Sequence, residues 1–464
     1  MFISGKVRMA AAPVNGKIEF AMKGSEFRNV GWTPVALVCL VTLALVLHGC
    51  ATGSDPKIQH IVVIVQENRS TDNLFHGFPN ADIADSGVNS TGEAIPLTPI
   101  NLANHYDLDH THSSFVLMYH GGRMDGADKV HVSCEPKGPN CPPPNAQFRY
   151  VDPSEVQTYF DLAEQYTFAD RMFQTNQGPS FPAHQFIIAG TSAPTAISDL
   201  FAAEDVVFPP YPGSNVQAGC AGPEGETVAM IDPMGVESTT QFPCFEHPTL
   251  LDLLDSQDIA WRYYAPSIGS VCTAPNAIKH LRFGSDWQKV IIPETKVLTD
   301  IAAGRFAQVT WVIPNGRNSD HPGINDGGGP SWVAAVVNAI GNSPYWWHTA
   351  IFITWDDWGG WYDHVAPKRL NSYEYGFRVP LIVVSPYAKK NYVSHQDHDF
   401  GSLLRFTEEV FQLPTLGYAD SRADDLSDCF DFDAAPSVFR AIAAKFDAVH
   451  FLNDKRPPLD PDDD

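Results

Sequence analysis

Acidic and amide side chains stand directly after two apolar segments of the sequence. Glu67 and Asn68 follow the run IQHIVVIVQ, and Asp356 and Asp357 follow the run AIFITW. Both runs are short, continuous and rich in β-branched residues, which is typical of strands buried in a parallel sheet. Ligands of open α/β sheets bind at the carboxyl ends of strands. Acids there can also cap helices or face water, but two such groups together favour a divalent cation.

A serine flanked by prolines is the second chemical feature. Ser180 lies in the sequence GPSFP, where the glycine and the prolines define a turn around the hydroxyl group. A rigidly placed hydroxyl suits a nucleophile, although this pattern is also a common plain turn. A serine esterase would need the pattern GxSxG, and Pro182 stands where its second glycine should be.

Histidines occur beside aspartates in four parts of the chain. Imidazole can ligate a metal, stabilise phosphoryl oxygens or protonate a leaving alkoxide. A single histidine is more often structural, but this distribution predicts that at least two of them are functional. The groups lie at residues 107–112, 320–321, 363–364 and 395–398.

The elements that must position these residues alternate between strands and helices. Such alternation predicts an α/β fold with helices layered on a mostly parallel sheet. Ser154 and Gln157 have the spacing of a capping box, which predicts that a helix starts there. The expected parallel strands are 58–66, 308–313, 350–355 and 379–385, with a weaker candidate at 259–264. The expected helices are 154–166, 250–255, 331–340 and 401–412.

Composition limits the kinds of partner that the protein can have. The chain has 464 residues, 44% of them hydrophobic, which is enough for a large buried core. Its formal net charge is −24, and an acidic surface repels nucleic-acid backbones. We therefore expect no nucleic-acid partner. A phosphate substrate remains compatible with this charge, because a metal ion and a few histidines can reverse the sign of a site locally.

The N-terminal region has the layout of an export signal. The apolar run PVALVCLVTLALVL follows Lys23 and Arg28, which predicts a signal peptide over residues 1–50. Its end resembles a lipoprotein cleavage box with Cys50 as the lipidated residue, and ordinary cleavage nearby is the alternative. Translation could start at Met22. We expect an exported protein, whether periplasmic, anchored to the cell envelope or secreted.

The cysteines agree with an oxidising compartment. Cys134 and Cys141 flank a proline-rich loop and are expected to form a local disulfide. Because the number of cysteines after residue 50 is even, all of them could pair as structural disulfides. The others are Cys220, Cys244, Cys272 and Cys429.

Several motifs taken in order resemble one bacterial phosphoesterase family. They are QENRSTDNLF, GPSFP, SDHP, TWDDWGGWYDHV, RVPLIVVSPYA and DHDFGSLLRF, and they span roughly residues 57–413. This family includes haemolytic and non-haemolytic phospholipases C and a respiratory-burst-inhibiting acid phosphatase. The resemblance implies an alkaline-phosphatase-like, three-layer α/β/α core with one divalent metal ion. We expect the catalytic domain over residues 51–430, and a helix and an acidic disordered tail over residues 431–464.

The resemblance also implies roles for individual residues. The metal ligands would be Glu67, Asn68, Asp356 and Asp357, the nucleophile Ser180, and the histidines of the phosphoryl site His110 and His321. The sequence departs from the family after the nucleophile, where members usually have Pro-Asn-Arg and this chain has Pro-Ala-His, ending at His184. The motif containing Asp363 and His364 receives no role.

These residues together predict phosphoester hydrolysis through a phosphoserine intermediate. The expected substrate is a phospholipid phosphodiester at a membrane surface, as for a phospholipase C. Two alternatives remain: an acid phosphatase acting on phosphomonoesters, and an exported protein that binds a phosphorylated ligand without cleaving it. The aromatic residues beside Asp356 could form a wall for a choline group, but packing in the core is favoured.

Overall fold

The computed structural model describes residues 56–134, 141–207 and 217–462. The predicted signal peptide, the alternative start at Met22 and the lipidation site Cys50 lie outside these residues. Within the described ranges, no helix is both long enough and apolar enough to cross a membrane.

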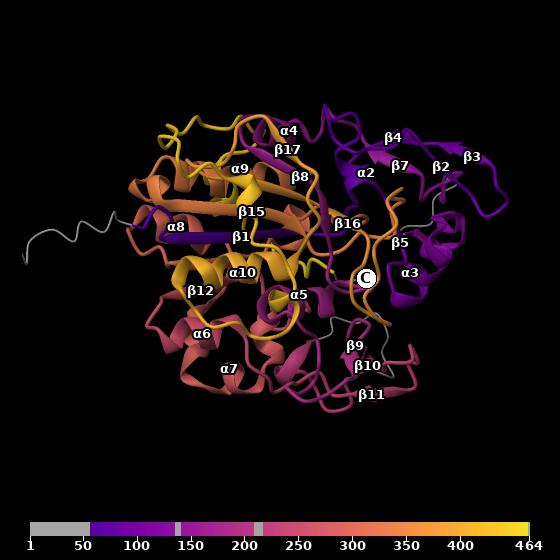
Figure 1. Cartoon of the computed structure of the whole chain (residues 1–464), viewed down its shortest axis with the longest axis horizontal. Helices are drawn as coiled ribbons and strands as arrows, with labels where there is room; N and C mark the ends of the chain where they lie inside the picture. The colour runs from indigo at the N-terminus through magenta and orange to yellow at the C-terminus, as the bar shows by residue number, and fades with distance from the viewer. Residues whose placement is uncertain (1–55, 135–140, 208–216, 463–464) are drawn as a thin grey trace, which may run out of the picture. The chain divides into compact units, whose positions relative to one another are not determined.

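A nine-stranded sheet forms the centre of the fold (Figure 1). Its strands are β1 (His60–Gln66), β8 (Thr167–Phe173), β12 (Trp261–Tyr264), β13 (Val290–Ile291), β14 (Val309–Val312), β15 (Thr349–Trp355), β16 (Arg378–Val384), β17 (Tyr392–Ser394) and β18 (His398–Asp399). They lie in the order β13-β12-β14-β1-β15-β16-β8-β17, and β18 also pairs with β8. The central strands β1, β15 and β16 are buried on both faces almost throughout, which explains their continuous apolar runs.

Most strand pairs are parallel, but β16 runs antiparallel to both of its neighbours, β15 and β8. The prediction of a parallel strand at residues 379–385 is therefore wrong in direction. A strand covered on both faces has the same apolar composition in either direction, so composition could not reveal the reversal. The sequence also failed to indicate β8, because Asp170 and Arg171 interrupt its apolar pattern.

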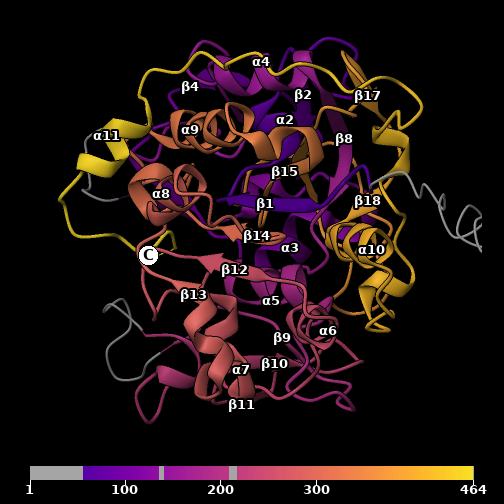
Figure 2. The same ribbon diagram turned by 90° about the vertical axis from the view of Figure 1, so that its left-hand side faces the viewer.

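Helices cover both faces of the sheet (Figure 2). Helices α4 (Gln157–Gln165), α8 (Lys296–Ala302) and α9 (Gly329–Gly341) lie on one face, and α5 (Ser180–Ala189), α6 (Leu250–Ser256) and α10 (Phe400–Phe411) lie on the other. The predicted three-layer α/β/α architecture is thus confirmed. The remaining α-helices are α2 (Thr71–Leu74), α3 (His112–Tyr119), α7 (Lys279–Phe283) and α11 (Ala448–Asn453).

The predicted helices at 250–255, 331–340 and 401–412 correspond to α6, α9 and α10. The capping box predicted at Ser154 is absent, because α4 begins at Gln157 and the Ser154 hydroxyl donates to Asp152 Oδ1 at 2.7 Å. Short strands occupy the long connections. They are β2 (Ser86–Val88) with β3 (Ala94–Pro96), β4 (Thr98–Ile100) with β7 (Arg149–Val151), β5 (Tyr106–Leu108) with β6 (Val132–Cys134), and β9 (Phe201–Ala202) with β10 (Val228–Ile231) and β11 (Thr239–Gln241).

Two disulfides are present in the described part of the chain. The predicted bridge between Cys134 and Cys141 is confirmed, and a second joins Cys220 to Cys244. Cys272 and Cys429 are buried free thiols, so the pairing that the even number of cysteines allows does not extend to these two. An even number of cysteines allows complete pairing but cannot show which thiols the fold brings together.

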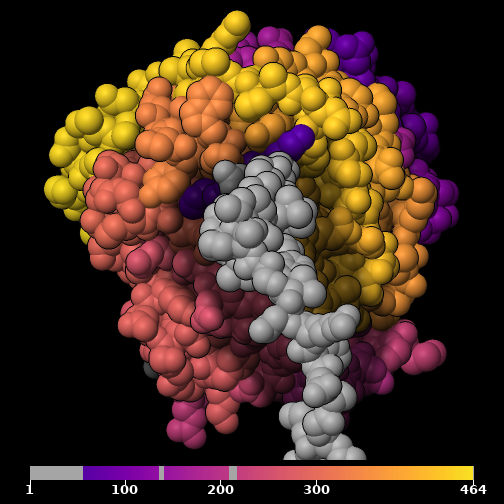
Figure 3. Space-filling model, turned by 60° about the vertical axis from the view of Figure 1, so that its left-hand side comes forward, coloured from indigo at the N-terminus to yellow at the C-terminus, as the bar shows by residue number. Residues whose placement is uncertain are grey.

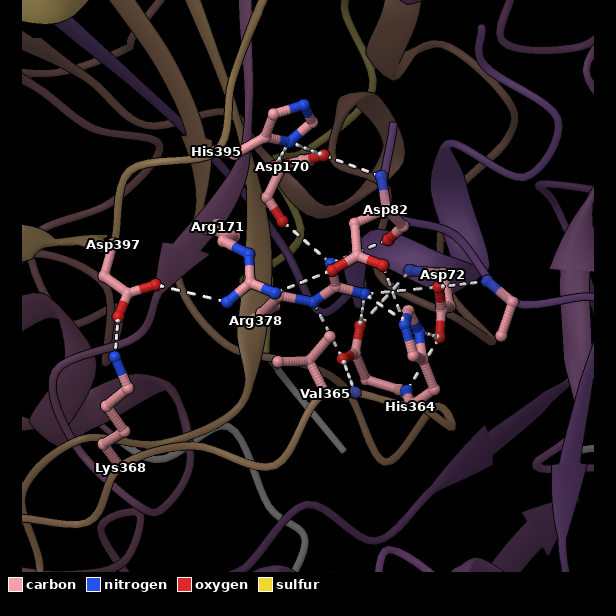
Figure 4. Close-up of polar contacts among 12 residues, drawn as sticks. Asp72, Asp82, Asp170, Arg171, His364, Val365, Lys368, Arg378, His395 and Asp397 are labelled. Atoms are coloured by element: carbon pink, nitrogen blue, oxygen red, sulfur yellow. Dashed lines mark hydrogen bonds and ion pairs between the residues drawn. The ribbon is translucent and has the colours of Figure 1, made fainter. Parts of the chain in front are cut away.

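A buried charge cluster ties helix α2 to the loop that follows β15 (Figure 4). Arg378, the first residue of β16, donates from Nε to Asp363 Oδ1 at 2.9 Å and from Nη2 to Asp72 Oδ1 at 3.2 Å. All three side chains are fully buried. His364 joins them, because its Nδ1 lies 2.7 Å from Asp72 Oδ2. Since α2 and Asp363 belong to the segments after β1 and β15, the cluster holds these two segments together.

This cluster predicts a pH-dependent contribution to stability. Burial alone would lower the pKa of His364, but the hydrogen bond and charge of Asp72, together with Asp363, raise it to about 9. Because this pKa exceeds the value of about 6.5 expected in the unfolded chain, the contribution is complete below pH about 6.5 and is lost as the pH rises through about 9.

Raising the pH should lower the free energy of unfolding by about 1 kcal/mol less in His364→Gln than in the wild-type protein. The full pKa shift would imply a larger difference, but the side chain is partly exposed and solvent screens its charge. Denaturant titrations of both proteins at pH about 6 and about 9.5 would measure the effect. If raising the pH from about 6 to about 9.5 lowers the free energy of unfolding equally in both proteins, His364 is not the source of the pH dependence.

Candidate functional site

The two acidic segments meet because their strands are parallel neighbours. Gln66, the last residue of β1, lies opposite Trp355, the last residue of β15. The residues that follow therefore emerge side by side. Asp356 Oδ1 accepts hydrogen bonds from the backbone N–H of Asn68 at 3.2 Å and of Asp357 at 2.8 Å.

Oxygen atoms in this group lack hydrogen-bond partners among the described residues. They are Glu67 Oε1, Asn68 Oδ1 and Asp356 Oδ2, and all three side chains are fully buried. Burial, followed by the charge of Asp356, raises the pKa of Glu67 well above its usual range. Burying unpaired carboxylates next to each other is costly unless a cation compensates them. Carboxylate and amide oxygens are suitable ligands for a divalent cation, so the residues fit the predicted metal ion.

Ser180 reaches the same edge of the sheet from strand β8. This strand runs parallel to β15, because both are antiparallel to β16, and the chain then enters helix α5 at Ser180. The Ser180 hydroxyl donates to Asp357 Oδ2 at 3.2 Å. The N-terminal end of the ten-residue helix favours negative charge at this oxygen. Gly178 is required before it, because a Cβ atom there would lie 2.6 Å from Ala203 O.

Two predicted histidines lie beside this serine and acid group. His110 Nδ1 is 2.8 Å from Leu108 O, which directs Nε2 toward Asn68 Nδ2 at 3.1 Å and Asp357 Oδ2 at 4.0 Å. His321 Nδ1 is 2.6 Å from Pro322 O. Burial would lower the pKa of His110, but the charge of Asp357 and nearby aspartates raises it well above its usual range. His110 Nε2 can thus accept from the amide when neutral or donate to a carboxylate when protonated.

A carboxylate from the C-terminal segment lies between the two histidines. Asp462 Oδ1 is 3.1 Å from His321 Nε2 and 3.6 Å from His110 Nε2. Burial would raise the pKa of Asp462, but the hydrogen bonds and charges of the two imidazoles lower it below its usual range. One anionic oxygen shared by two imidazoles is the arrangement that a phosphoryl oxygen would also need.

The described part of the C-terminal segment packs against the fold, whereas the sequence predicted disorder there. Gly316 N donates to Leu459 O at 3.0 Å, and Ser270 Oγ donates to Asp460 Oδ1 at 2.8 Å. Figure 3 shows the C-terminal part of the chain (yellow) along the upper border of one face, next to segments drawn in orange. A run of aspartates and prolines carries no periodic pattern, so the sequence could not show that Asp462 would contact the histidines.

His184 is a residue of the site that sequence analysis did not identify. Its Nε2 lies 3.6 Å from Glu67 Oε1 and 3.7 Å from Asp356 Oδ2, and its side chain is fully buried. The signal was present, because residues four apart on a helix share one face and His184 follows Ser180 by four positions in α5. Cys272 lies beside Glu67 as well, with its Sγ 3.8 Å from Glu67 Oε2.

Other residues that the sequence singled out make contacts of their own. Asp363 and His364 belong to the charge cluster that Arg378 organises, and Figure 4 shows that His395 forms its own pair with Asp170 in the same region. Trp358 and Trp361 are fully buried in a second apolar cluster. Packing in the core, rather than a wall for a choline group, therefore accounts for these two tryptophans.

Several phospholipases C are similar to this chain in sequence. The chain is 24% identical over 440 residues to the hemolytic phospholipase C of Pseudomonas aeruginosa, an alignment that covers 83% of this chain and 57% of that protein. It is 21% identical over 459 residues to phospholipase C B of Mycobacterium tuberculosis, covering 84% and 80%. Non-specific phospholipase C6 of Arabidopsis thaliana is 25% identical, with 77% and 67% covered. The chain thus spans little more than half of the first of these relatives.

Among solved structures, similar chains include a protein of the alkaline phosphatase superfamily from Vibrio parahaemolyticus. Its TM-score is 0.35 at 9% identity, covering 81% of this chain and 74% of that one. The lipoteichoic acid synthase LtaP of Listeria monocytogenes has a TM-score of 0.36 at 9% identity, covering 83% and 81%. The model of the phosphoesterase family matches residues 58–414, nearly the range over which the motifs resemble it. This chain therefore belongs to the phosphoesterase family.

Proposed function

We propose that the protein is a phospholipase C that hydrolyses phospholipid phosphodiesters with Ser180 as its nucleophile and one divalent metal ion. The observation that carries this proposal is the position of Ser180. Ser180 is the first residue of helix α5, and its hydroxyl donates to Asp357. Beside it lie buried oxygens that have no hydrogen-bond partner among the residues that the structure describes. The names of the relatives favour a phosphodiester substrate. Such a substrate requires contact with a membrane surface.

The residues that would hold the metal ion are Glu67, Asn68, Asp356 and Asp357. When bound, the ion supplies positive charge that lowers the pKa of the serine hydroxyl and offsets charge on the phosphoryl group. Asp357 Oδ2 already accepts the hydrogen bond of this hydroxyl and can therefore take its proton.

In the first step, Ser180 Oγ forms a bond to phosphorus while the bond to the leaving alkoxide breaks. The product is a phosphoserine, and the alkoxide takes a proton from one of the two histidines and leaves as diacylglycerol. His110 and His321 stabilise the phosphoryl oxygens, in the position where Asp462 now places its carboxylate. In the second step, the histidine that gave up its proton takes one from water, which attacks phosphorus. The bond to Ser180 Oγ breaks, the serine takes its proton back from Asp357, and the phosphorylated head group leaves.

The first test is cleavage of p-nitrophenylphosphorylcholine, a phosphodiester, compared with p-nitrophenyl phosphate, a phosphomonoester. We expect Ser180→Ala to lower turnover of the diester by about 10³-fold or more, because covalent catalysis is lost. A chelator should abolish turnover, and added divalent metal should restore it. Ser385→Ala is the matched control, because Ser385 is also fully buried but follows β16 at the opposite edge of the sheet.

The outcomes separate the candidate functions. Near-full activity of Ser180→Ala would remove this residue from the mechanism. Faster cleavage of the monoester would indicate an acid phosphatase that uses the same site. Folded, metal-loaded protein that cleaves neither substrate would overturn hydrolysis of both types and favour a protein that binds a phosphorylated ligand.

The Asp462 carboxylate should compete with phosphate for the two histidines. Replacing it in Asp462→Asn removes the charge that now pairs with them, so inorganic phosphate should inhibit this variant at about 10-fold lower concentration. Asp454→Asn is the control, because Asp454 lies in the same segment but pairs with Arg456. Equal inhibition constants for wild-type protein and Asp462→Asn would show that Asp462 does not occupy the phosphate position.

A further inference from the structure

We propose that His184 Nε2 is a ligand of the divalent cation, so that the site binds a transition ion such as Zn²⁺ in preference to Mg²⁺ or Ca²⁺. The inference rests on the metal ion of the proposed function and adds a ligand and a metal class to it. The residues assigned to the metal by their resemblance to the phosphoesterase family are all oxygen donors. His184 is the departure from the family pattern, in which arginine usually stands at this position.

The spacing of the side chains suits a shared ion. His184 Nε2 is 3.6 Å from Glu67 Oε1 and 3.7 Å from Asp356 Oδ2. These separations are too long for hydrogen bonds. Zinc ligands lie about 2.0–2.3 Å from the ion, so two ligands of a tetrahedral site lie about 3.3–3.8 Å apart. The nitrogen therefore lies at the distance from each of these two oxygens that is expected when both atoms bind one small cation.

His184 differs from other buried histidines of the chain in its contacts. His110, His247 and His321 each place one ring nitrogen within 3.0 Å of a backbone carbonyl oxygen. Neither nitrogen of His184 has a hydrogen-bond partner in the described part of the chain, although the side chain is fully buried. The oxygens that it faces, Glu67 Oε1 and Asp356 Oδ2, also lack partners. A cation between these three atoms would satisfy all of them together.

The chemistry of the donors then selects the metal class. Oxygen ligands alone suit Mg²⁺, Ca²⁺ or Mn²⁺, whereas imidazole suits Zn²⁺, Cu²⁺, Fe²⁺ and Ni²⁺. An arginine at this position would carry its own charge and could not ligate, but histidine offers a lone pair. Helix α5 also fixes the nitrogen relative to Ser180 one turn away, so one rigid element carries both the nucleophile and the ligand.

Isothermal titration calorimetry of chelator-treated protein with Zn²⁺ and with Mg²⁺ tests the inference without measuring activity. His184→Gln should weaken Zn²⁺ binding at least about 10-fold, since loss of even a residue that supports a ligand costs 10–100-fold. Mg²⁺ affinity should change less than about 2-fold, because the oxygen ligands remain. His247→Gln is the matched control, because His247 is a buried histidine that contacts Pro248 O rather than the acid group.

A second measurement needs no variant and therefore does not depend on how His184→Gln folds. X-ray absorption of the Zn²⁺-loaded wild-type protein should show outer-shell scattering from imidazole, and a shell of oxygen alone would overturn the inference. Unchanged Zn²⁺ affinity in folded His184→Gln would overturn it as well. If wild-type protein binds neither ion, the metal-dependent function itself fails, whereas metal binding without a contribution from His184 refutes only this inference.

Discussion

The concentration of buried carboxylates at one edge of the sheet is the constraint on which the rest of the site depends. Glu67, Asp356 and Asp357 are fully buried within a few ångströms of one another, and an apolar interior cannot hold such a group without compensating charge. Several features around this group bear on its charge, and the Asp462 carboxylate adds to that charge rather than offsetting it. The N-terminal end of helix α5 and the imidazoles of His110 and His184 lie against this group, and Arg378 neutralises the neighbouring acids.

Sequence reasoning succeeded where short-range patterns carry the information. A β-branched run predicts a buried strand, and parallel strands end at the same edge, so the approach of Glu67 to Asp356 follows from two short motifs. The position of Ser180 beside Asp357 was harder to predict, because it requires β8 to lie two strands from β15 with the reversed β16 between them. Resemblance to the family supplied that relation, whereas periodicity could not.

The features that sequence reasoning missed depend on contacts between distant segments. Nothing around Asp462 marks it as a partner of His321, because 141 positions separate the two residues and the intervening elements decide where the segment returns. For the same reason, the sequence could not show that Cys272 is a free thiol. His184 is different, because its spacing from Ser180 was visible in the sequence, but its importance emerges only when Glu67 and Asp356 are known to face it.

The reversal of strand β16 has a consequence for how this site can change during evolution. Because β15 ends and β16 begins at the same edge, residues 356–377 join the two strands on the side where Asp356 and Asp357 lie, with no crossover to the other edge of the sheet. A parallel strand would have required a crossover whose length is tied to packing on a face of the sheet. Insertions or deletions beyond the charge cluster can therefore reshape access to the site while strand pairing stays intact, which allows related enzymes to diverge in substrate range on one scaffold.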